Sequence, residues 1–274
     1  MTLPLPFLSR HRLRDTIKMP GPLVKVRRYV QRKSARLVFQ RPQTIHLDRP
    51  LISFTFDDFP RTALLNGGAI LKRFGLTATY FTAMGLIGKD SPSGPIENEE
   101  DLIKALEDGH ELGCHTYSHC HSWTTPTSTF EESVNLNGVA LGELVPGHQF
   151  KSFSYPISEP RPLTKRAVSK YFQCCRAGGQ TLNAGTADLN QLAAYFLERS
   201  KNGIQEVREL IDLNSEECGW IIFATHDVTE NPSPYGCTPE FFEDVVQYAV
   251  DSGAQILPVV QALERIQSSE LSRR

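Results

Sequence analysis

Adjacent acidic residues and a spaced pair of histidines are the side chains of this sequence that best suit metal-assisted chemistry. Asp57 and Asp58 are neighbours, and His115 and His119 stand four residues apart. Histidines at that spacing lie on one face of a helical turn, close enough to bind one ion. With one carboxylate they make a His₂-Asp set that leaves a coordination position open for water, as catalytic zinc sites do. The second aspartate can then act as a general base.

These residues belong to a set of four polar turns that follow short apolar runs: Asp57-Asp58, His115 to His119, Tyr155 to Ser158, and Thr225-His226-Asp227. Parallel α/β folds gather functional side chains where their strands end, so we expect the four turns to meet. Taken singly, Asp57-Asp58 is equally typical of a turn or helix cap. His226 alone is equally typical of a half-buried imidazole with satisfied hydrogen bonds.

The elements that must position these turns alternate between apolar strands and amphipathic helices. This alternation predicts an α/β protein with a parallel sheet, either open or closed into a barrel. The predicted strands span 51–56, 77–84, 111–115, 152–155, 172–176, 192–197, 220–224 and 255–257. The predicted helices span 62–74, 99–107, 130–144, 163–171, 203–213, 239–250 and 259–266.

The composition is that of an ordinary globular protein, with 40% hydrophobic and 22% charged residues among 274. It excludes disordered, collagen-like and coiled-coil chains. A chain of this length buries about 75% of its unfolded surface in one core, so one large domain fits as well as two small ones. Neither a signal peptide nor a transmembrane segment is predicted, which favours a cytoplasmic location with six reduced cysteines. The adjacent Cys174 and Cys175 should point to opposite faces of a strand.

The charge is divided unevenly along the chain. Residues 1–49 contain twelve Lys or Arg against two Asp, a net charge of +10, whereas the whole chain carries −2 and the remaining 225 residues therefore carry −12. This excludes a uniformly basic nucleic-acid binder, and no nucleic-acid partner is expected. Residues 22–39 predict a basic amphipathic helix. It can pack on the acidic body, contact an anionic membrane or glycan, or serve in mitochondrial targeting.

The motifs resemble those of the polysaccharide deacetylases that act on chitin and peptidoglycan. The resemblance rests on Phe56-Asp57-Asp58, His115-x-x-x-His119, Tyr155-Pro156 and Phe223-Ala224-Thr225-His226, and covers about residues 50–263. It implies a single distorted or incomplete (β/α) barrel with a basic N-terminal extension. The domains would be the extension at 1–49, the catalytic domain at 50–267 and a polar tail at 268–274.

The resemblance also implies a role for each motif residue. Asp58, His115 and His119 would bind a divalent metal, most often Zn²⁺, with Co²⁺ or Ni²⁺ as alternatives. Asp57 would be the general base that takes a proton from the metal-activated water, and His226 the general acid that protonates the departing amine. The backbone N–H of Ile157, beside Tyr155 in the same turn, would help to hold the oxyanion.

The sequence departs from the family pattern at several positions. The family often has Gly after the aspartate pair, where this chain has Phe59, and an Arg before the Pro turn, where this chain has Ser154. Arg176, after the next strand, can replace that guanidinium beside Asp57, or it can be an ordinary surface residue. Phe223 and Trp220 can line a pocket for the acetyl methyl group, or they can be core residues.

Three functions follow from this reading. The first is a metal-dependent hydrolase that removes N-acetyl or O-acetyl groups from an N-acetylated oligo- or polysaccharide. The second uses the same scaffold on a small non-glycan amide, formamide or cyclic imide. The third is a non-catalytic carbohydrate-binding relic, against which the intact set of acidic and histidine residues argues.

Overall fold

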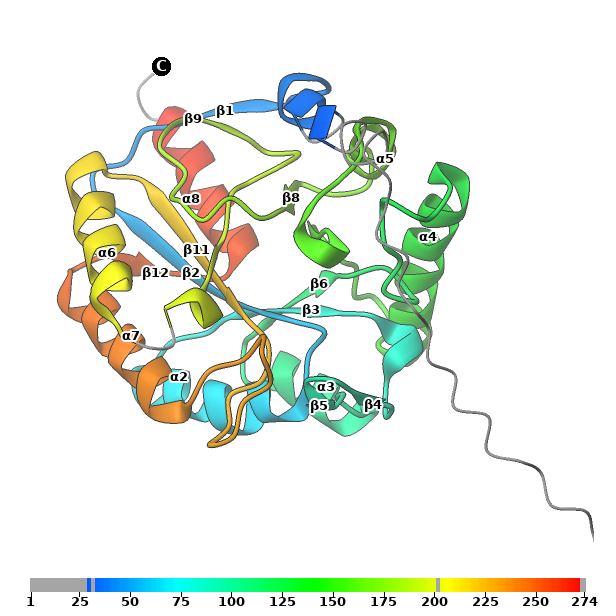
Figure 1. The fold of residues 1–274 in the computed structure, drawn as a ribbon, viewed down its shortest axis with the longest axis horizontal. Helices are drawn as coiled ribbons and strands as arrows, with labels where there is room; N and C mark the ends of the chain where they lie inside the picture. The colour runs from blue at the N-terminus through cyan, green and yellow to red at the C-terminus, as the bar shows by residue number, and fades with distance from the viewer. Residues whose placement is uncertain (1–28, 31–32, 201–202, 272–274) are drawn as a thin grey trace, which may run out of the picture.

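A curled parallel sheet forms the centre of the protein in the computed structural model, which describes residues 29–30, 33–200 and 203–271 (Figure 1). The sheet makes a half-barrel, as expected for a distorted (β/α) barrel. Its strands follow the order β10-β11-β2-β3-β6-β7-β8, and β12 also pairs with β2. The strands span β2 (Leu51–Asp57), β3 (Thr79–Thr82), β6 (Glu111–Cys114), β7 (Ser152–Ser154), β8 (Cys174–Arg176), β10 (Tyr195–Phe196), β11 (Trp220–Thr225) and β12 (Gln255–Ile256).

The two longest strands are apolar because both of their faces are covered. Every residue of β2 and β11 is buried, which is typical of central strands in a parallel sheet. The register aligns Thr225 with Phe56, Asp57 with Phe81, and Ser154 with Arg176. The strands therefore end at one level, and the polar turns that follow them meet at one edge of the sheet.

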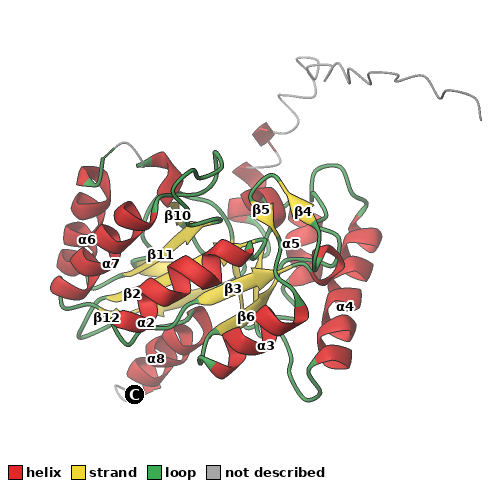
Figure 2. Cartoon of the chain, turned by 90° about the horizontal axis from the view of Figure 1, so that it is seen from below, coloured by secondary structure: helices red, strands yellow, loops and turns green. Residues whose placement is uncertain are grey.

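Helices cover the outside of the sheet (Figure 2). A π-helical turn (Ala63–Gly68) leads into α2 (Ala69–Arg73), followed by α3 (Glu99–Glu107), α4 (Thr127–Leu144), α5 (Pro162–Val168), α6 (Gln205–Glu217), α7 (Pro239–Asp251) and α8 (Val259–Leu271). Helix α3 begins at a capping box between Asn98 and Asp101. None of the helices in the described ranges is long and apolar enough to cross a bilayer.

Most predicted elements are present with ends shifted by a few residues. The strand predicted at 192–197 is shortened to β10, and the first turns of the helix predicted at 62–74 are π-helical. Two antiparallel pairs were not predicted. They are β1 (Pro42–Ile45) with β9 (Gly185–Asp188), and the hairpin of β4 (Asp90–Ser91) and β5 (Gly94–Pro95).

The segment 33–47 packs against the body of the protein. Residues 33–37 are helical, and β1 follows them. The fully buried Lys165 donates to the Ala35 carbonyl oxygen at 2.7 Å and forms an ion pair with Asp188 on β9. The Arg41 guanidinium donates to the Phe172 carbonyl oxygen at 3.1 Å. Half of the helix predicted at 22–39 lies outside the described residues.

All six cysteines are free thiols, as predicted. Cys174 and Cys175 point to opposite faces of β8, because Cys174 belongs to one hydrophobic cluster and Cys175 to the other. Burial raises the pKa of the Cys175 thiol to about 12, so this buried cysteine is a neutral core residue.

Candidate active site

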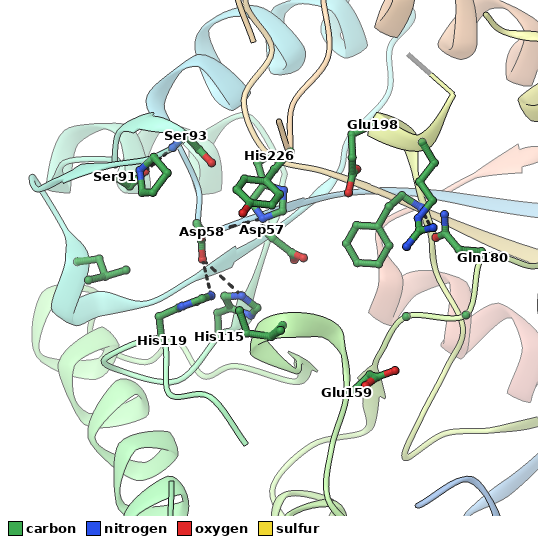
Figure 3. A pocket seen from close by; sticks show the side chains of 18 of the residues that line it. Asp57, Asp58, Ser91, Ser93, His115, His119, Glu159, Gln180, Glu198 and His226 are labelled. Carbon is green, nitrogen blue, oxygen red and sulfur yellow. Dashed lines mark hydrogen bonds and ion pairs between the residues drawn. The ribbon is translucent and has the colours of Figure 1, made fainter. Parts of the chain in front are cut away.

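Asp58, His115 and His119 meet at the edge where the parallel strands end (Figure 3). Asp58 Oδ1 lies 3.5 Å from His115 Nε2 and 3.2 Å from His119 Nε2. The predicted helical turn is wrong, because the two histidines flank a turn that follows β6. Left-handed backbone at Thr116 (φ 62°) and His119 (φ 50°) folds that turn back on itself and brings the two imidazoles together.

The three ligand atoms fit a divalent cation. The His115 Nδ1 lies 2.8 Å from the Ser154 carbonyl oxygen, which only accepts, so Nδ1 carries the hydrogen and Nε2 presents a lone pair to Asp58. Asp58 Oδ1 is buried and receives no hydrogen bond in the described part of the chain. Tetrahedral zinc ligands at about 2.1 Å from the ion lie about 3.4 Å from one another, close to the separations found here.

Burial keeps His115 in the neutral form that a metal requires. It lowers the pKa of this histidine to about 4, although the nearby Asp57 acts in the opposite direction. The imidazole is 2% exposed. The imidazole is therefore uncharged at neutral pH.

The backbone around this group holds uncommon conformations. Asp58 (φ 60°), His119 (φ 50°) and Ile157 (φ 60°) all lie in the left-handed region, where a β-branched residue such as Ile157 is rare. Such conformations persist only where the surrounding structure imposes them, and they gather at functional sites. Phe59, at the position where the family often has Gly, is also left-handed (φ 50°).

Asp57 is held by a buried arginine. Arg176 Nη2 donates to Asp57 Oδ1 and, at 2.5 Å, to Ser154 Oγ. The guanidinium is 1% exposed and lies between the rings of Phe81 and Phe196, 5.1 and 5.4 Å from their centroids. Arg176 is therefore a buried residue, and the alternative that it is an ordinary surface arginine is wrong. Its contact with Asp57 is the one that the sequence suggested.

Arg176 keeps Asp57 ionised in spite of its burial. Burial alone raises the pKa of this carboxyl, but the Arg176 charge, followed by His115 and His226, lowers it to about 2. Asp57 is thus a carboxylate at any ordinary pH. It stands beside Asp58 at the end of β2, with no role in the three-ligand group.

His226 faces the same centre from the end of β11. Its Nε2 lies 4.0 Å from Asp58 Oδ2, and its buried Nδ1 receives or donates no hydrogen bond among the described residues. The Tyr235 ring lies beside it, with centroids 5.5 Å apart. The loop that carries Tyr235 is fixed by the buried Asp227, which accepts from Ser233 N at 2.7 Å.

These groups open into a cavity of about 730 Å³, within the range of sites for small organic ligands. Asp57, Asp58, His115, His119 and His226 line it. Ile157 also lines it with a side chain that is 56% exposed. The remaining lining residues come mainly from two regions, the β4–β5 hairpin and the chain at 178–180 and 196–199.

Four residues singled out from the sequence do not line this cavity. Arg176 is buried and contacts Asp57, which lines the cavity, as described above. Tyr155 is buried and donates to the Asn190 carbonyl oxygen at 3.2 Å. Trp220 and Phe223 are fully buried, Trp220 donating to Ser53 Oγ at 3.0 Å and Phe223 stacking on Phe54, so both are core residues.

Several lining residues were not predicted as part of the site, namely Arg36, Gln180, Glu198 and Arg199. Burial raises the pKa of the Glu198 carboxyl, which His226 partly offsets. Glu198 and Arg199 follow a short strand whose end marks this edge of the sheet, which is a weak sequence signal. Arg36 has no such signal, because the N-terminal segment reaches the cavity through tertiary packing.

Residues 45–173 match the family model for polysaccharide deacetylase. No curated protein sequence matches the chain significantly. Among solved structures, a family 4 acetyl xylan esterase from Clostridium thermocellum, in complex with a cobalt ion, is similar at 20% identity and a TM-score of 0.54. That match covers 77% of this chain and 89% of the esterase.

Two other similar structures differ in activity. A peptidoglycan deacetylase from Bacillus subtilis is 18% identical, with a TM-score of 0.55 over 82% of this chain and 95% of that one. A family 4 pseudoenzyme from Bacillus anthracis is 12% identical, with a TM-score of 0.56. The match covers 80% of this chain and 67% of the pseudoenzyme. At these identities the likeness is one of fold. Residues 45–173 are thus similar to polysaccharide deacetylases, and the fold is the half-barrel of the family 4 carbohydrate esterase structures.

Proposed function

We propose that the protein is a metal-dependent hydrolase that removes N-acetyl or O-acetyl groups from a carbohydrate. The observation that carries the proposal is the position of Asp58 Oδ1, which lies 3.2 and 3.5 Å from two imidazole nitrogens and accepts no hydrogen bond from the described residues. The adjacent Asp57 is ionised and belongs to no ligand set. A metal group and a separate base at one strand end are what this hydrolysis needs.

Asp58, His115 and His119 would hold the cation. When bound, a divalent cation supplies Lewis-acid chemistry, polarising an acetyl carbonyl and making water acidic enough to act as a nucleophile at neutral pH. The ligand types suit Zn²⁺, Co²⁺ and Ni²⁺ alike. The cobalt ion in the Clostridium esterase structure supports a first-row transition metal.

Asp57 would accept the proton of the attacking water. Its ion pair with Arg176 fixes one carboxylate oxygen, and Asp57 also lines the cavity. A general base must be ionised and correctly aimed at the moment of attack, and the ion pair serves both needs. Arg176 is thus a positioning residue, acting through Asp57.

His226 would donate a proton to the leaving amine or alcohol. It lines the cavity on the other side of Asp58 from the two histidine ligands and carries a buried Nδ1 without a partner among the described residues. The backbone N–H of Ile157 would contribute to the oxyanion site. The left-handed backbone of Ile157 supports this role, because it re-aims the peptide groups at the rim of the cavity.

The size of the cavity favours a saccharide over a small amide. A volume of about 730 Å³ suits a ligand much larger than a formamide or a cyclic imide. A non-catalytic carbohydrate-binding protein is the alternative function, because one similar structure is a pseudoenzyme. The complete Asp57, Asp58, His115, His119 and His226 set supports catalysis against it.

The boundaries of the catalytic domain, 50–267, and the cytoplasmic location remain predictions. So does contact between residues 22–39 and an anionic membrane or glycan. The packing of residues 33–47 on the body supports a basic segment that belongs to the folded unit. Equal retention of the full chain and a chain lacking residues 1–32 on anionic vesicles at low salt would argue against the membrane role.

The test combines metal content with acetate release. Protein purified without a chelator should contain about one divalent ion per chain and release acetate from N-acetylated chito-oligosaccharides. Asp57→Asn should retain the metal and lose turnover by about 10²-fold or more. Absence of any divalent ion, or unchanged hydrolysis by Asp57→Asn, would contradict the proposal. Hydrolysis of small amides alone would favour the second function.

A further inference from the structure

The cavity carries a set of nitrogen donors that the proposed chemistry does not use. Arg36, Gln180 and Arg199 all line it, and we call these three residues the basic rim. Gln180 lies beyond Asp57 and His226 in Figure 3, on the side away from the Ser91 and Ser93 hairpin. All three residues of the rim line the cavity that holds Asp57, Asp58 and His226, so a substrate bound there can reach them.

The described part of the chain provides few partners for the donors of the rim. None of the ion pairs in the described part of the chain includes Arg36 or Arg199. The Gln180 amide is oriented, because its Oε1 accepts from Phe196 N at 2.8 Å. Its Nε2 is buried and has no hydrogen-bond partner among residues 33–200 and 203–271. A buried donor without a partner is costly, so a ligand acceptor at this position is expected to stabilise it.

Two of the acidic groups that line the cavity face partners other than the basic rim. Asp57 is paired with Arg176, and Asp58 faces the imidazoles. Burial raises the pKa of the Glu198 carboxyl, and the neighbouring Arg199 charge acts in the opposite direction. Glu159 lines a different part of the cavity wall, away from Gln180 in Figure 3.

The position of Arg36 is fixed by the fold. Arg36 itself is exposed, but its neighbour Ala35 is 1% exposed, and the Ala35 carbonyl accepts from the buried Lys165. Asn190 Nδ2 donates to the Phe39 carbonyl oxygen at 2.8 Å on the other side. The chain on both sides of Arg36 is thus anchored, which reduces the entropy lost when its guanidinium binds a ligand.

We propose that the basic rim binds a negatively charged substituent of the substrate, so that the preferred substrate is an acidic N-acetylated saccharide. This inference rests on the proposed function for the acetyl group and adds the substrate class. Carboxylate, sulfate and phosphate share the required chemistry, since each offers several acceptor oxygens to arginine and amide N–H groups. Arg36 and Arg199 are then specificity-determining residues.

Binding is measured by calorimetry on the full-length Asp57→Asn protein, which does not consume the ligand. The probes are tetrasaccharides of equal length: neutral N-acetylglucosamine, alternating N-acetylglucosamine and glucuronate, and sulfated and phosphorylated N-acetylated forms. We expect an acidic probe to bind about three- to tenfold more tightly than the neutral one at low salt. The preference should shrink as ionic strength rises.

Arg36→Ala and Arg199→Ala should each remove much of this preference without weakening the neutral probe. Lys33→Ala is the matched control, because it removes one exposed positive charge from the same helical segment but does not line the cavity. Equal binding of all probes, or no binding of the acidic ones, would overturn the inference. So would an equal loss in Lys33→Ala and Arg36→Ala. The ranking among the acidic probes identifies the anion.

Acetate release by the otherwise unchanged protein separates this inference from the proposed function. If no saccharide is hydrolysed but acidic probes bind more tightly, the rim is an anion site and the deacetylase function fails. If neutral and acidic saccharides are hydrolysed and bound alike, the function stands and the inference fails.

Discussion

Arg176, at the end of β8, reaches Asp57, at the end of β2, although three strands lie between them in the sheet. The contact is therefore made across the interior of the half-barrel. The Arg176 guanidinium lies over the rings of Phe81 on β3 and Phe196 on β10. One side chain thus links the two ends of the curled sheet and aims the carboxylate that we propose as the base.

Arg176→Ala should lower turnover by about 10- to 100-fold and also destabilise the protein, because it leaves a buried carboxylate without its counter-charge. Burial then acts unopposed and raises the pKa of Asp57, so the acidic limb of the kcat/KM profile should move to higher pH. Arg176→Lys should restore part of both properties. An unchanged rate and pH profile in Arg176→Ala would contradict the positioning role.

His119→Ala should abolish stoichiometric metal binding while leaving the fold intact, since this histidine is partly exposed. For the unmodified protein, metal at about 100 times its Kd contributes about 2.7 kcal/mol, which corresponds to a rise in Tm of about 5–10 °C. The variant should show no such rise. His121→Ala, two residues away and outside the metal group, is the control and should respond like the unmodified protein. An equal metal-induced rise in His119→Ala would exclude His119 as a ligand.

Tyr235→Ala should raise KM several-fold by removing the ring that lies against His226 at the cavity. Tyr235→Phe keeps the ring and should behave like the unmodified protein in steady-state kinetics. If both variants raise KM equally, the hydroxyl and not the ring is responsible. Asp227→Ala should act more broadly, because it releases the whole loop, and limited proteolysis should detect new cleavage within 228–236.

Lys165→Met should lower the free energy of unfolding by about 3 kcal/mol, because it leaves Asp188 without its buried ammonium partner. Protease should then cleave near residues 33–40, which Lys165 anchors. Lys170→Met is the control, since Lys170 forms only a long, exposed pair with Glu131 at 3.9 Å and should change stability by less than about 1 kcal/mol. Equal effects of the two substitutions on urea unfolding would contradict this prediction.

His110 should make the protein less stable as the pH falls. Burial lowers its pKa from 6.5 to about 4, and its Nδ1 accepts from Ala78 N at 3.0 Å, a bond that protonation would break. The unfolded chain takes up the proton near pH 6.5 and the folded chain only near pH 4. About 3 kcal/mol is therefore present above pH 6.5 and lost between 6.5 and 4.

Urea unfolding of the metal-free protein at pH 7 and pH 4.5 measures this loss. His110→Gln, which keeps an acceptor for Ala78 N, should be less stable at pH 7 but show a smaller difference between the two pH values. An undiminished difference in this variant would assign the acid sensitivity to other groups.

The elements and the strand-end chemistry were predictable because their signals are local. Continuous apolar runs such as 220–225 mark strands buried on both faces, and the same double burial explains why Trp220 and Phe223 are core residues. The pairing of Arg176 with Asp57 was suggested by the absence of an arginine at position 154. The first inference needed only residue types and their order, whereas the second also needed the resemblance to a known family.

The remaining features depend on contacts or conformations that leave no local trace. The β1–β9 pair joins segments about 140 residues apart, and Arg36, which precedes β1 in the chain, lines the cavity. The His115–His119 spacing suggested a helix, whereas left-handed residues within the turn bring the two rings together. Such conformations are imposed by tertiary structure on residues that disfavour them.

The anchoring of residues 33–47 has a consequence for the order of assembly during synthesis. This segment leaves the ribosome early, but Lys165 and Asp188, which hold it, are 130 residues or more downstream. Long-range closure of this kind is slow compared with local folding. The strand ends that carry Asp57 and His115 can therefore form before the segment 33–47, which carries Arg36, packs beside the cavity. The basic segment should remain accessible to chaperones or to an anionic surface until the second half of the chain has been made.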